Sequence, residues 1–266
     1  MLAAMRQSRI LDEVRRTGGV RVSSLTQLLQ VSDMTIRRDL EVMAKKGLIA
    51  KVHGGATAID TASALELDFE EKIARETAEK QAIAVRAAEL VHPGMAVALT
   101  AGTTTWTLAT HLAEIANLTI VTNSLKVAEV MHAGGRDDLT LVLTGGIRTP
   151  SDGLVGPVAV QAIRSLNVDM VIMGVHGIDE RAGLTTPNLL EAETNRAFVD
   201  SARRLVVIAD NTKWGVVGLS QIAPLESVTT LVTDDHLEPR AAAILAERVG
   251  EVICVESQHD DEADIQ

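Results

Sequence analysis

Hydrophobic positions follow two different patterns along this chain. Up to residue 57, apolar side chains recur at helical spacing in three short segments, which is typical of small packed helices. From residue 95 onward, continuous apolar runs of strand length alternate with helical patterns. We therefore expect a small, mainly helical N-terminal unit and a larger α/β unit.

The N-terminal segment predicts three helices and a small β-wing. Ser23 is placed to cap the second helix, and Ser32 is placed to cap the third. One glycine pair ends the first helix, and another follows the last strand pattern. The expected elements are, in order, a helix at 6–19, a short strand at 20–22, helices at 23–32 and 34–47, and a wing at 48–55.

Strand and helix patterns alternate through the C-terminal unit. Nearly continuous apolar strands are buried on both faces, as in a mainly parallel, Rossmann-like sheet covered by helices. The expected strands are 95–99, 118–122, 139–143, 169–175, 205–210, 228–233 and 251–255, with helices at 104–116, 124–133, 157–166, 189–202 and 239–249. The chain then divides into a winged unit at 1–57, a linker with a connecting helix at 58–80, an α/β unit at 81–256 and a disordered acidic tail at 257–266. The connecting helix is expected to continue through residues 81–91.

Charge is distributed unevenly between these units. The chain has a net charge of −11, yet residues 1–57 hold ten Lys and Arg against five Asp and Glu. A basic head would contact a phosphate backbone that the acidic body repels. The chain has one cysteine, Cys254, and no apolar run of ~18 residues. We therefore expect no disulfide, no membrane span and a cytoplasmic protein.

The third helix is the main candidate for nucleic-acid contact. On a helical wheel Ile36, Leu40 and Met43 share one face, while Arg38 and Lys45 lie opposite. In a helix-turn-helix, the N-terminal end of the second helix enters the major groove, where arginine bonds guanine edges or phosphates. The alternative is a solvated charged face, because acidic residues interrupt the basic ones. These acidic residues are Asp33, Asp39 and Glu41.

The order of helix, strand, helix, basic helix and wing favours contact with double-stranded DNA. Aromatic residues, which would stack on single-stranded bases, are absent from residues 1–57. The predicted DNA-contacting residues are Ser32, Thr35, Arg37, Arg38 and Lys45, joined by Lys51 and His53 of the wing.

A candidate anion site follows the first strand of the α/β unit. The segment TAGTTTW (100–106) leaves a strand and opens a helix. Glycine permits close backbone approach, and threonine hydroxyls beside free helix amides suit a phosphate. The alternative is a capped turn that binds nothing. The residues concerned are Thr100, Gly102, Thr103, Thr104 and Thr105.

Further polar residues follow other strands. The carboxyl ends of parallel strands meet at one edge of an open α/β sheet, where ligands bind. Each residue alone is more often a turn residue or a surface charge, but the set marks an effector site, in which Lys213 would supply a positive charge. The set comprises Thr122, Asn123, Ser124, Gly145, Gly146, Arg148, Asp152, Asp179, Glu191 and Lys213.

The chain resembles the DeoR family of bacterial sugar-operon regulators in a series of ordered motifs. The head carries RQSRILDEV and VSSLTQLLQVSDMTIRRDLEVMAKKGLIAKVHGGA. The body carries AGTTTWTLA, IVTNSLKVA, LTGGIRTPSDGLVGPVA, GVHGIDERAGLT and IADNTKWG. The resemblance covers nearly the whole chain. It implies a repressor or other regulator, not an enzyme, that binds operator DNA and a phosphorylated sugar or related metabolite and forms a homo-oligomer, a dimer or tetramer.

The family's sensor fold is similar to ribose-5-phosphate isomerases. A phosphosugar isomerase with a DNA-binding head is therefore the alternative, and Asp179, Glu191 and Lys213 could serve it as acids and bases. Thr100 departs from the family's pattern, because members commonly have an acidic residue there. His176 is also a less expected side chain near the expected pocket, where a packed histidine is the main interpretation and an acid–base group is the alternative. The seven histidines show no metal-ligand spacing, so neither a metal nor a cofactor is expected.

Overall fold

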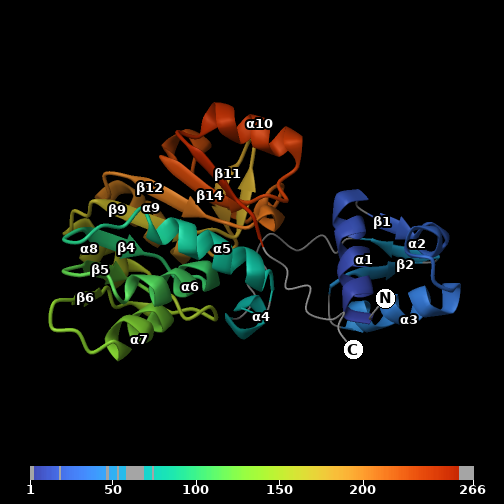
Figure 1. Ribbon diagram of the computed structural model, residues 1–266, viewed down its shortest axis with the longest axis horizontal. Coiled ribbons are helices and arrows are strands. Elements are labelled where there is room, and N and C mark those ends of the chain that lie inside the picture. The colour runs from blue at the N-terminus through green and yellow to red at the C-terminus, as the bar shows by residue number, and fades with distance from the viewer. Residues whose placement is uncertain are drawn as a thin grey trace. The chain divides into compact units, whose positions relative to one another are not determined.

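The computed structural model describes residues 3–17, 19–45, 48–52, 54–57, 69–73 and 75–257. Contacts divide the chain into two compact units, Met1–Ser63 and Ala64–Gln266, which are drawn in Figure 1. Most of the predicted linker, and all of the predicted acidic tail after Ser257, lie outside the described residues. In the described part of the chain, no helix is both long and apolar enough to cross a bilayer.

The smaller unit is a winged helix-turn-helix. Its three strands form one antiparallel sheet in the order β1-β3-β2, so the wing is paired with the strand that precedes the second helix. This confirms the expected order of elements. They are α1 (Ala3–Thr17), β1 (Gly19–Arg21), α2 (Val22–Leu29), α3 (Asp33–Lys45), β2 (Ala50–Val52) and β3 (Gly55–Thr57).

The core of this unit explains why α3 presents its basic face outward. Ile36, Leu40 and Met43 are at most 1% exposed and pack in one apolar cluster with residues of α1 and α2. The predicted inner face of α3 is thus confirmed. The predicted cap of α2 is wrong: the helix starts one residue before Ser23, and its N-cap Arg21 makes no side-chain capping bond. The paired β1 strand leads directly into α2 and positions its first turn instead.

The larger unit alternates helices and strands, as the apolar pattern predicts. Its first half contains α4 (Phe69–Ile73), α5 (Thr77–Ala88), β4 (Ala96–Leu99), α6 (Thr103–Leu112), β5 (Thr119–Thr122), α7 (Leu125–Ala133), β6 (Thr140–Leu143), β7 (Ile147–Arg148), β8 (Leu154–Val155) and α8 (Pro157–Arg164). Its second half contains β9 (Met170–Gly174), β10 (Gly177–Asp179), β11 (Gly183–Thr186), α9 (Leu189–Ser201), β12 (Leu205–Ile208), η1 (Asn211–Lys213), β13 (Ser220–Ala223), η2 (Leu225–Ser227), β14 (Thr230–Asp234), α10 (Pro239–Arg248) and β15 (Val252–Val255).

All seven predicted apolar runs enter a single parallel sheet. The strand order is β15-β14-β12-β9-β4-β5-β6. From β4, the strands β5 and β6 follow on one side, and β9, β12, β14 and β15 follow on the other. The order therefore reverses between β4 and β9. In open α/β sheets, this switch point leaves a crevice outside the carboxyl ends of the strands.

Two apolar layers hold the sheet between helices (Figure 1). Val97 and Leu99 of β4 pack with the helices α5, α6 and α7 on one face. Ala98 between them packs in the other layer with α8, α9 and α10. Alternation within a continuous apolar run thus fills both faces, which is the physical reason for the run.

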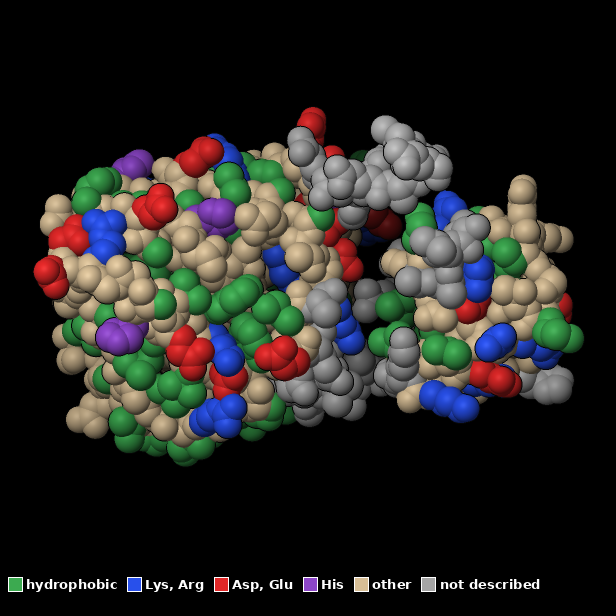
Figure 2. Space-filling model, turned by 60° about the horizontal axis from the view of Figure 1, so that its bottom comes forward, with side chains coloured by type: hydrophobic (Ala, Val, Ile, Leu, Met, Phe, Trp, Pro, Cys, Tyr) green, Lys and Arg blue, Asp and Glu red, His purple; other side chains and the backbone are tan. Residues whose placement is uncertain are grey.

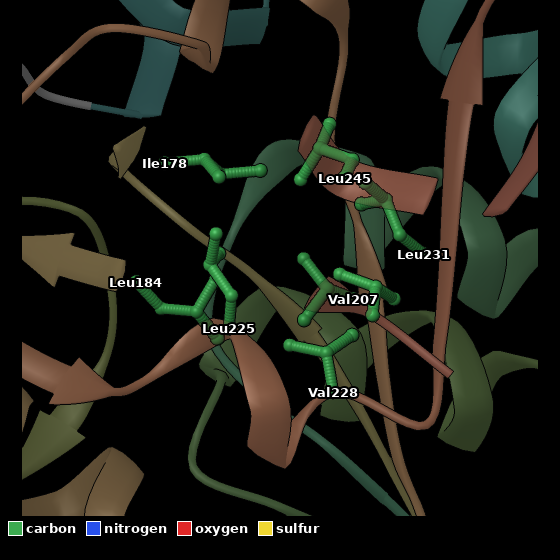
Figure 3. A pocket seen from close by; sticks show the side chains of 8 residues that line it. Ile178, Leu184, Val207, Leu225, Val228, Leu231 and Leu245 are labelled. Atoms are coloured by element: carbon green, nitrogen blue, oxygen red, sulfur yellow. The ribbon is translucent and has the colours of Figure 1, made fainter. Parts of the chain in front are cut away.

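A small antiparallel sheet, β10-β11-β13, was not predicted. Figure 3 shows how it is attached: Ile178 and Leu184 point toward Val207 and Leu231 of the main sheet and Leu245 of α10. These side chains leave no space for a water molecule between the layers. The small sheet is therefore fixed to the main sheet by apolar packing, and this contact is no ligand cavity.

The connecting helix is two helices. The pattern predicts one helix continuing through residue 91, but α4 ends at Ile73 and α5 begins at Thr77. Glu76 before α5 has a left-handed backbone, with φ of 47°. A continuous right-handed helix cannot pass through such a residue.

Candidate DNA interface and effector site

Polar residues at the N-terminal end of α3 cap the helix by hydrogen bonds. The amide of Thr35 donates to the Ser32 hydroxyl at 3.2 Å, and the two hydroxyls lie 2.8 Å apart. Ser32 therefore caps α3, as predicted. Because the cap fixes the first turn, it also positions the side chains that follow it on the outer face.

Two of the predicted DNA-contacting cations are paired with carboxylates of α3. The guanidinium of Arg37 binds the carboxylate of Asp33 through Nε, and its Nη2 lies 3.5 Å from Asp33 Oδ2. Lys51 of β2 donates to Glu41 at 2.6 Å. These contacts raise the pKa of Arg37 and lower the pKa of the Glu41 carboxyl. Figure 2 shows basic and acidic side chains beside one another on this unit.

Arg38 and Lys45 differ from this pair. Both are exposed, and within the described part of the chain neither has a hydrogen-bond or ion-pair partner. The predicted outer face of α3 is therefore present. Of the predicted cations, Arg37 and Lys51 are paired with carboxylates, whereas Arg38 and Lys45 are exposed and have no such partner among the described residues. His53, predicted on the wing, lies outside the described residues.

Asp39 has a structural role that sequence reasoning missed. It is 4% exposed, and it accepts from Arg6 Nε at 2.5 Å and from Gln7 Nε2 at 3.0 Å. Both donors belong to α1, so this carboxylate fixes α3 against the first helix. The alternative of a purely solvated acidic and basic face is therefore wrong at this position, because Asp39 faces inward.

The carboxyl end of β4 holds an unusual hydroxyl. Thr100 is fully buried at the switch point, and its Oγ1 has no hydrogen-bond partner among the described residues. The following turn opens α6, whose N-cap Gly102 makes no side-chain capping bond. A Cβ at Gly102 would lie 3.1 Å from Thr105 Oγ1, so a side chain there would crowd the first turn. Uncapped first-turn amides and a buried free hydroxyl therefore face the same edge.

The polar residues after β5 mainly hold this edge in shape. Asn123 accepts from the amide of Ala101 at 2.9 Å and donates to the carbonyl of Leu154 at 3.0 Å. The Thr122 hydroxyl donates to the carbonyl of Leu99 at 2.7 Å, which ties β5 to β4. Ser124 caps α7 by accepting from Val127. These side chains position the turn after β4. Most of their hydrogen-bonding groups are already bonded to other residues of the chain.

The segment after β6 folds back over the end of β5. The carbonyl of Asp152 accepts from the amide of Leu125 at 3.1 Å, and Arg148 donates to the Asp152 carboxylate at 2.5 Å. Gly145 and Gly146 both have positive φ, and a Cβ at Gly146 would lie 2.6 Å from the carbonyl of Val155. The two glycines therefore serve the backbone path. The fold brings this whole predicted group to the edge beside Asn123.

Two charged residues meet at the end of β12. Asp210 is 2% exposed, and one of its oxygens accepts from the amide of Thr212 at 3.1 Å. Its other oxygen, Oδ2, has no hydrogen bond within the part of the chain that the structure describes and lies 3.8 Å from Lys213 Nζ. A buried carboxylate oxygen that lacks a donor is costly, and it favours a ligand hydroxyl as its partner.

Lys80 of α5 interacts electrostatically with Asp210 and Lys213. Lys80 was not predicted as a site residue from the sequence. It is 5% exposed, and Nζ donates to the carbonyl of Lys72 at 2.6 Å. Burial lowers the pKa of Lys80 to about 8, against an opposing effect of Asp210. The signal was present: Lys80 precedes the buried residues Ile83 and Ala84 by three and four positions, so it lies on the inner face of α5.

The chain matches known proteins in both units. Residues 75–235 match the DeoR C terminal sensor domain, and residues 6–62 match the DeoR-like helix-turn-helix domain. The chain belongs to the DeoR family. It is a transcriptional regulator with a DNA-binding head and a sensor unit, and not an enzyme.

This DeoR-family chain is similar to curated regulators over nearly its full length. It is 32% identical to the uncharacterized HTH-type transcriptional regulator YulB of Bacillus subtilis over 96% of this chain and 98% of that one. It is 32% identical to a putative aga operon transcriptional repressor of Escherichia coli O157:H7, over 94% and 93% of the two chains. The glycerol-3-phosphate regulon repressor of Escherichia coli is 30% identical, over 90% and 98%.

Among solved structures, this DeoR-family chain is similar over part of its length to a D-ribose-5-phosphate isomerase in complex with phospho-erythronic acid. The TM-score is 0.38 at 15% identity, covering 56% of this chain and 55% of the other.

The carboxylates considered for isomerase chemistry serve separate local contacts. Asp179 accepts from the amides of Arg181 and Ala182, each at 2.8 Å, and closes the β10–β11 turn. Glu191 of α9 accepts from the Thr186 hydroxyl at 2.8 Å. His176 is half-buried after β9. The family membership, together with these local hydrogen bonds of Asp179 and Glu191, argues against the isomerase alternative.

Two further features of this DeoR-family chain lie apart from the switch point. An open hollow of about 460 Å³ lies at the opposite, amino edge of the sheet and is lined partly by Arg203 and Asp169. The side-chain atoms of Asp234, Asp235 and His236 that could ligate a metal ion lie within 4.8 Å of one another. The spacing of the histidines along the sequence did not suggest this group. Asp234 accepts from Asn211 at 2.7 and 2.8 Å, so it fixes the turn after β12.

Proposed function

We propose that this chain is a repressor of an operon for sugar or carbohydrate metabolism and that a phosphorylated sugar controls it. The sugar phosphate binds the carboxyl edge of β4, β5 and β12. The observation that carries the proposal is the buried Thr100 hydroxyl, without a partner, beside the uncapped N-terminus of α6. An unpaired buried hydroxyl at a switch point gains a hydrogen bond when a polar ligand arrives.

The two ends of the ligand have different partners in this proposal. The phosphate accepts from first-turn amides of α6 around Thr103–Thr105, and the ammonium groups of Lys213 and Lys80 balance its charge. The sugar hydroxyls bond Thr100 and Oδ2 of Asp210, which accepts no hydrogen bond from the described residues. Asp210 thus supplies a carboxylate at this edge, although a neutral threonine stands where the family commonly has an acid.

The head would bind double-stranded operator DNA through the N-terminal half of α3. Arg37 and Arg38 read base edges or phosphates in the major groove, and Lys51 of the wing contacts the backbone. Two relatives are named as repressors of an aga operon and of a glycerol-3-phosphate regulon, which supports repression in sugar-related metabolism. A dimer or tetramer in the cytoplasm would place two or more heads on repeated half-sites.

A route from the ligand to the head passes through α4, which follows the segment joining the units. Trp106 of α6 packs against Phe69 of α4 with ring centroids 6.0 Å apart. Lys80 donates to the carbonyl of Lys72 at the C-terminal end of α4. A phosphate that draws Lys80 or shifts α6 therefore changes what holds α4. Such a ligand regulates only if it binds the two states with different affinity.

The test is a titration of the full chain onto labelled duplex from its own upstream region, with and without a panel of sugar phosphates. Specific binding that one phosphosugar shifts would support both halves of the proposal. Lys213→Ala should keep DNA binding and blunt the ligand response. Binding that no phosphosugar alters would reject the effector class, and binding without preference for any upstream sequence would reject the operator.

A further inference from the structure

The recognition helix carries a carboxylate in contact with an arginine that is proposed to contact DNA. Asp33, the first residue of α3, engages Nε of Arg37 and lies 3.5 Å from its Nη2. Both side chains remain more than half exposed, at 58% and 56% of their surfaces. Arg38, the next residue, is exposed and has no such partner among the described residues. The contact therefore distinguishes two neighbouring arginines by chemistry.

The geometry of the contact decides which part of Arg37 remains available. A guanidinium has five N–H groups in a rigid plane. Asp33 accepts from Nε and, at 3.5 Å, from one N–H of Nη2. Among the described residues, nothing accepts from the other N–H of Nη2 or from Nη1. Two parallel N–H groups of this kind match the O6 and N7 acceptors of guanine in the major groove. Holding the plane in advance also reduces the rotamer entropy that the side chain loses on binding.

We propose that Asp33 is a specificity-determining residue of the operator interface: its carboxylate orients Arg37 for a guanine edge and repels phosphate from it. An arginine without this partner can turn to the nearest phosphate, which carries no sequence information. The inference rests on the proposed DNA contact of Arg37. It assigns to Asp33 a role in discrimination between sequences, beyond the favourable position of any acid at a helix N-terminus.

Glu41 provides the matched control on the same helix. Its carboxylate pairs with Lys51 of the wing at 2.6 Å, and both side chains are about half exposed. Lysine is a flexible point charge without a planar pair of donors, so orienting it selects no base. Removing the Glu41 charge should therefore strengthen binding to every duplex alike.

The experiment compares Asp33→Asn and Glu41→Gln in the full chain, on operator duplex and on a shuffled duplex over a series of salt concentrations. For Asp33→Asn we expect tighter binding to shuffled DNA, a salt slope steeper by about one on that duplex, and an operator-to-shuffled ratio reduced about tenfold. Glu41→Gln should tighten both and keep the ratio. A purely structural Asp33 would lower the melting temperature without moving the ratio, and that result would overturn the inference.

A double variant tests whether Asp33 acts through Arg37. Arg37→Ala alone should lower the operator-to-shuffled ratio, and adding Asp33→Asn should change that ratio no further. An additional loss in the double variant would contradict the inference, because Asp33 would then act on some other group. Failure of the proposed function looks different: the unaltered chain would then show no preference for operator over shuffled duplex.

Discussion

The ring of Phe69 in α4 meets the indole of Trp106 in α6 edge-on, with centroids 6.0 Å apart and planes at 87°. Edge-on pairs of this kind are favourable beyond the area they bury, by ~1 kcal/mol. Lys126 of α7 lies 5.9 Å from the Phe69 centroid and adds a cation over the same ring. Phe69 is 6% exposed, so this contact buries an aromatic side chain of the short helix α4. The partner Trp106 belongs to the helix whose first turn forms the candidate phosphate site.

Replacement of Trp106 by leucine should uncouple ligand binding from DNA binding. Leucine keeps an apolar contact with Phe69 but loses the edge-on geometry, so α4 no longer follows α6. We expect operator affinity and calorimetric ligand affinity to change less than about threefold, while the ligand's effect on DNA affinity largely disappears. Phe69→Leu should behave in the same way. An undiminished ligand effect in both variants would exclude this route.

Replacement of Thr100 by valine should stabilise the protein and weaken its ligand response. No described residue hydrogen-bonds the buried Oγ1, so its removal relieves a desolvation cost of about 1 kcal/mol, visible as a higher melting temperature without ligand. The same change removes a donor that the proposed sugar hydroxyl needs. Calorimetry with the effector should show weaker binding. A destabilised Thr100→Val variant would show that the hydroxyl has a partner within the protein, and unchanged ligand affinity would remove Thr100 from the site.

Lys80 should make ligand affinity fall with rising pH. Burial lowers the pKa of this ammonium to about 8, and a bound phosphate stabilises its charged form. Affinity is therefore full near pH 7 and falls as the pH rises through 8, by at most about tenfold per pH unit. Calorimetry on both sides of pH 8 measures this slope. Lys80→Met should bind more weakly and lose the slope, and a slope that persists in this variant would assign the proton elsewhere.

The same pKa has the opposite consequence for stability without ligand. Because the lysine pKa is 10.5 when unperturbed and about 8 in the folded chain, the unfolded state binds more protons between these values. Stability should therefore rise as the pH increases through this window. Chemical denaturation of the ligand-free chain, compared with Lys80→Met, isolates this contribution.

Arg38 and Lys45 should differ in what their loss does to DNA binding. Arg38 lies near the start of α3 and Lys45 ends it, so only Arg38 is placed where a recognition helix meets base edges. Arg38→Ala should cost about 1–3 kcal/mol on operator duplex, with relaxed specificity. Lys45→Ala should weaken all duplexes alike and lower the salt slope by about one. Equal effects of both variants on all sequences would place Arg38 on the phosphate backbone.

Asp39 should matter to folding of the head more than any exposed acid of α3. Its carboxylate is buried and accepts from Arg6 and Gln7, so its removal takes a charged acceptor away from the guanidinium of Arg6, whose side chain is only 11% exposed. Asp39→Ala should lower the melting temperature and weaken DNA binding to every sequence. Glu41→Ala, on an exposed pair, is the comparison and should leave the melting temperature nearly unchanged. Equal melting temperatures would show that the buried pair does not hold α3 against α1.

The sequence by itself determined the elements of this protein, because hydrophobic period is a local property. The apolar runs specify buried strands, the spacing of Ile36, Leu40 and Met43 specifies the inner face of α3, and a serine at residue 32 suffices for its cap. The motifs, in their order along the chain, indicated the family. Position along the chain was thus enough wherever a residue's partner lies within a few positions.

Tertiary structure alone decided the contacts between distant residues. Lys80 lies near Asp210 only because β12 and the start of α5 meet at one edge of the sheet, and strand order follows from crossovers that no local pattern records. For the same reason Asp39 was read as a surface acid, whereas α1 buries it. A side chain's chemistry depends on what surrounds it, and for these residues the surroundings come from elsewhere in the chain.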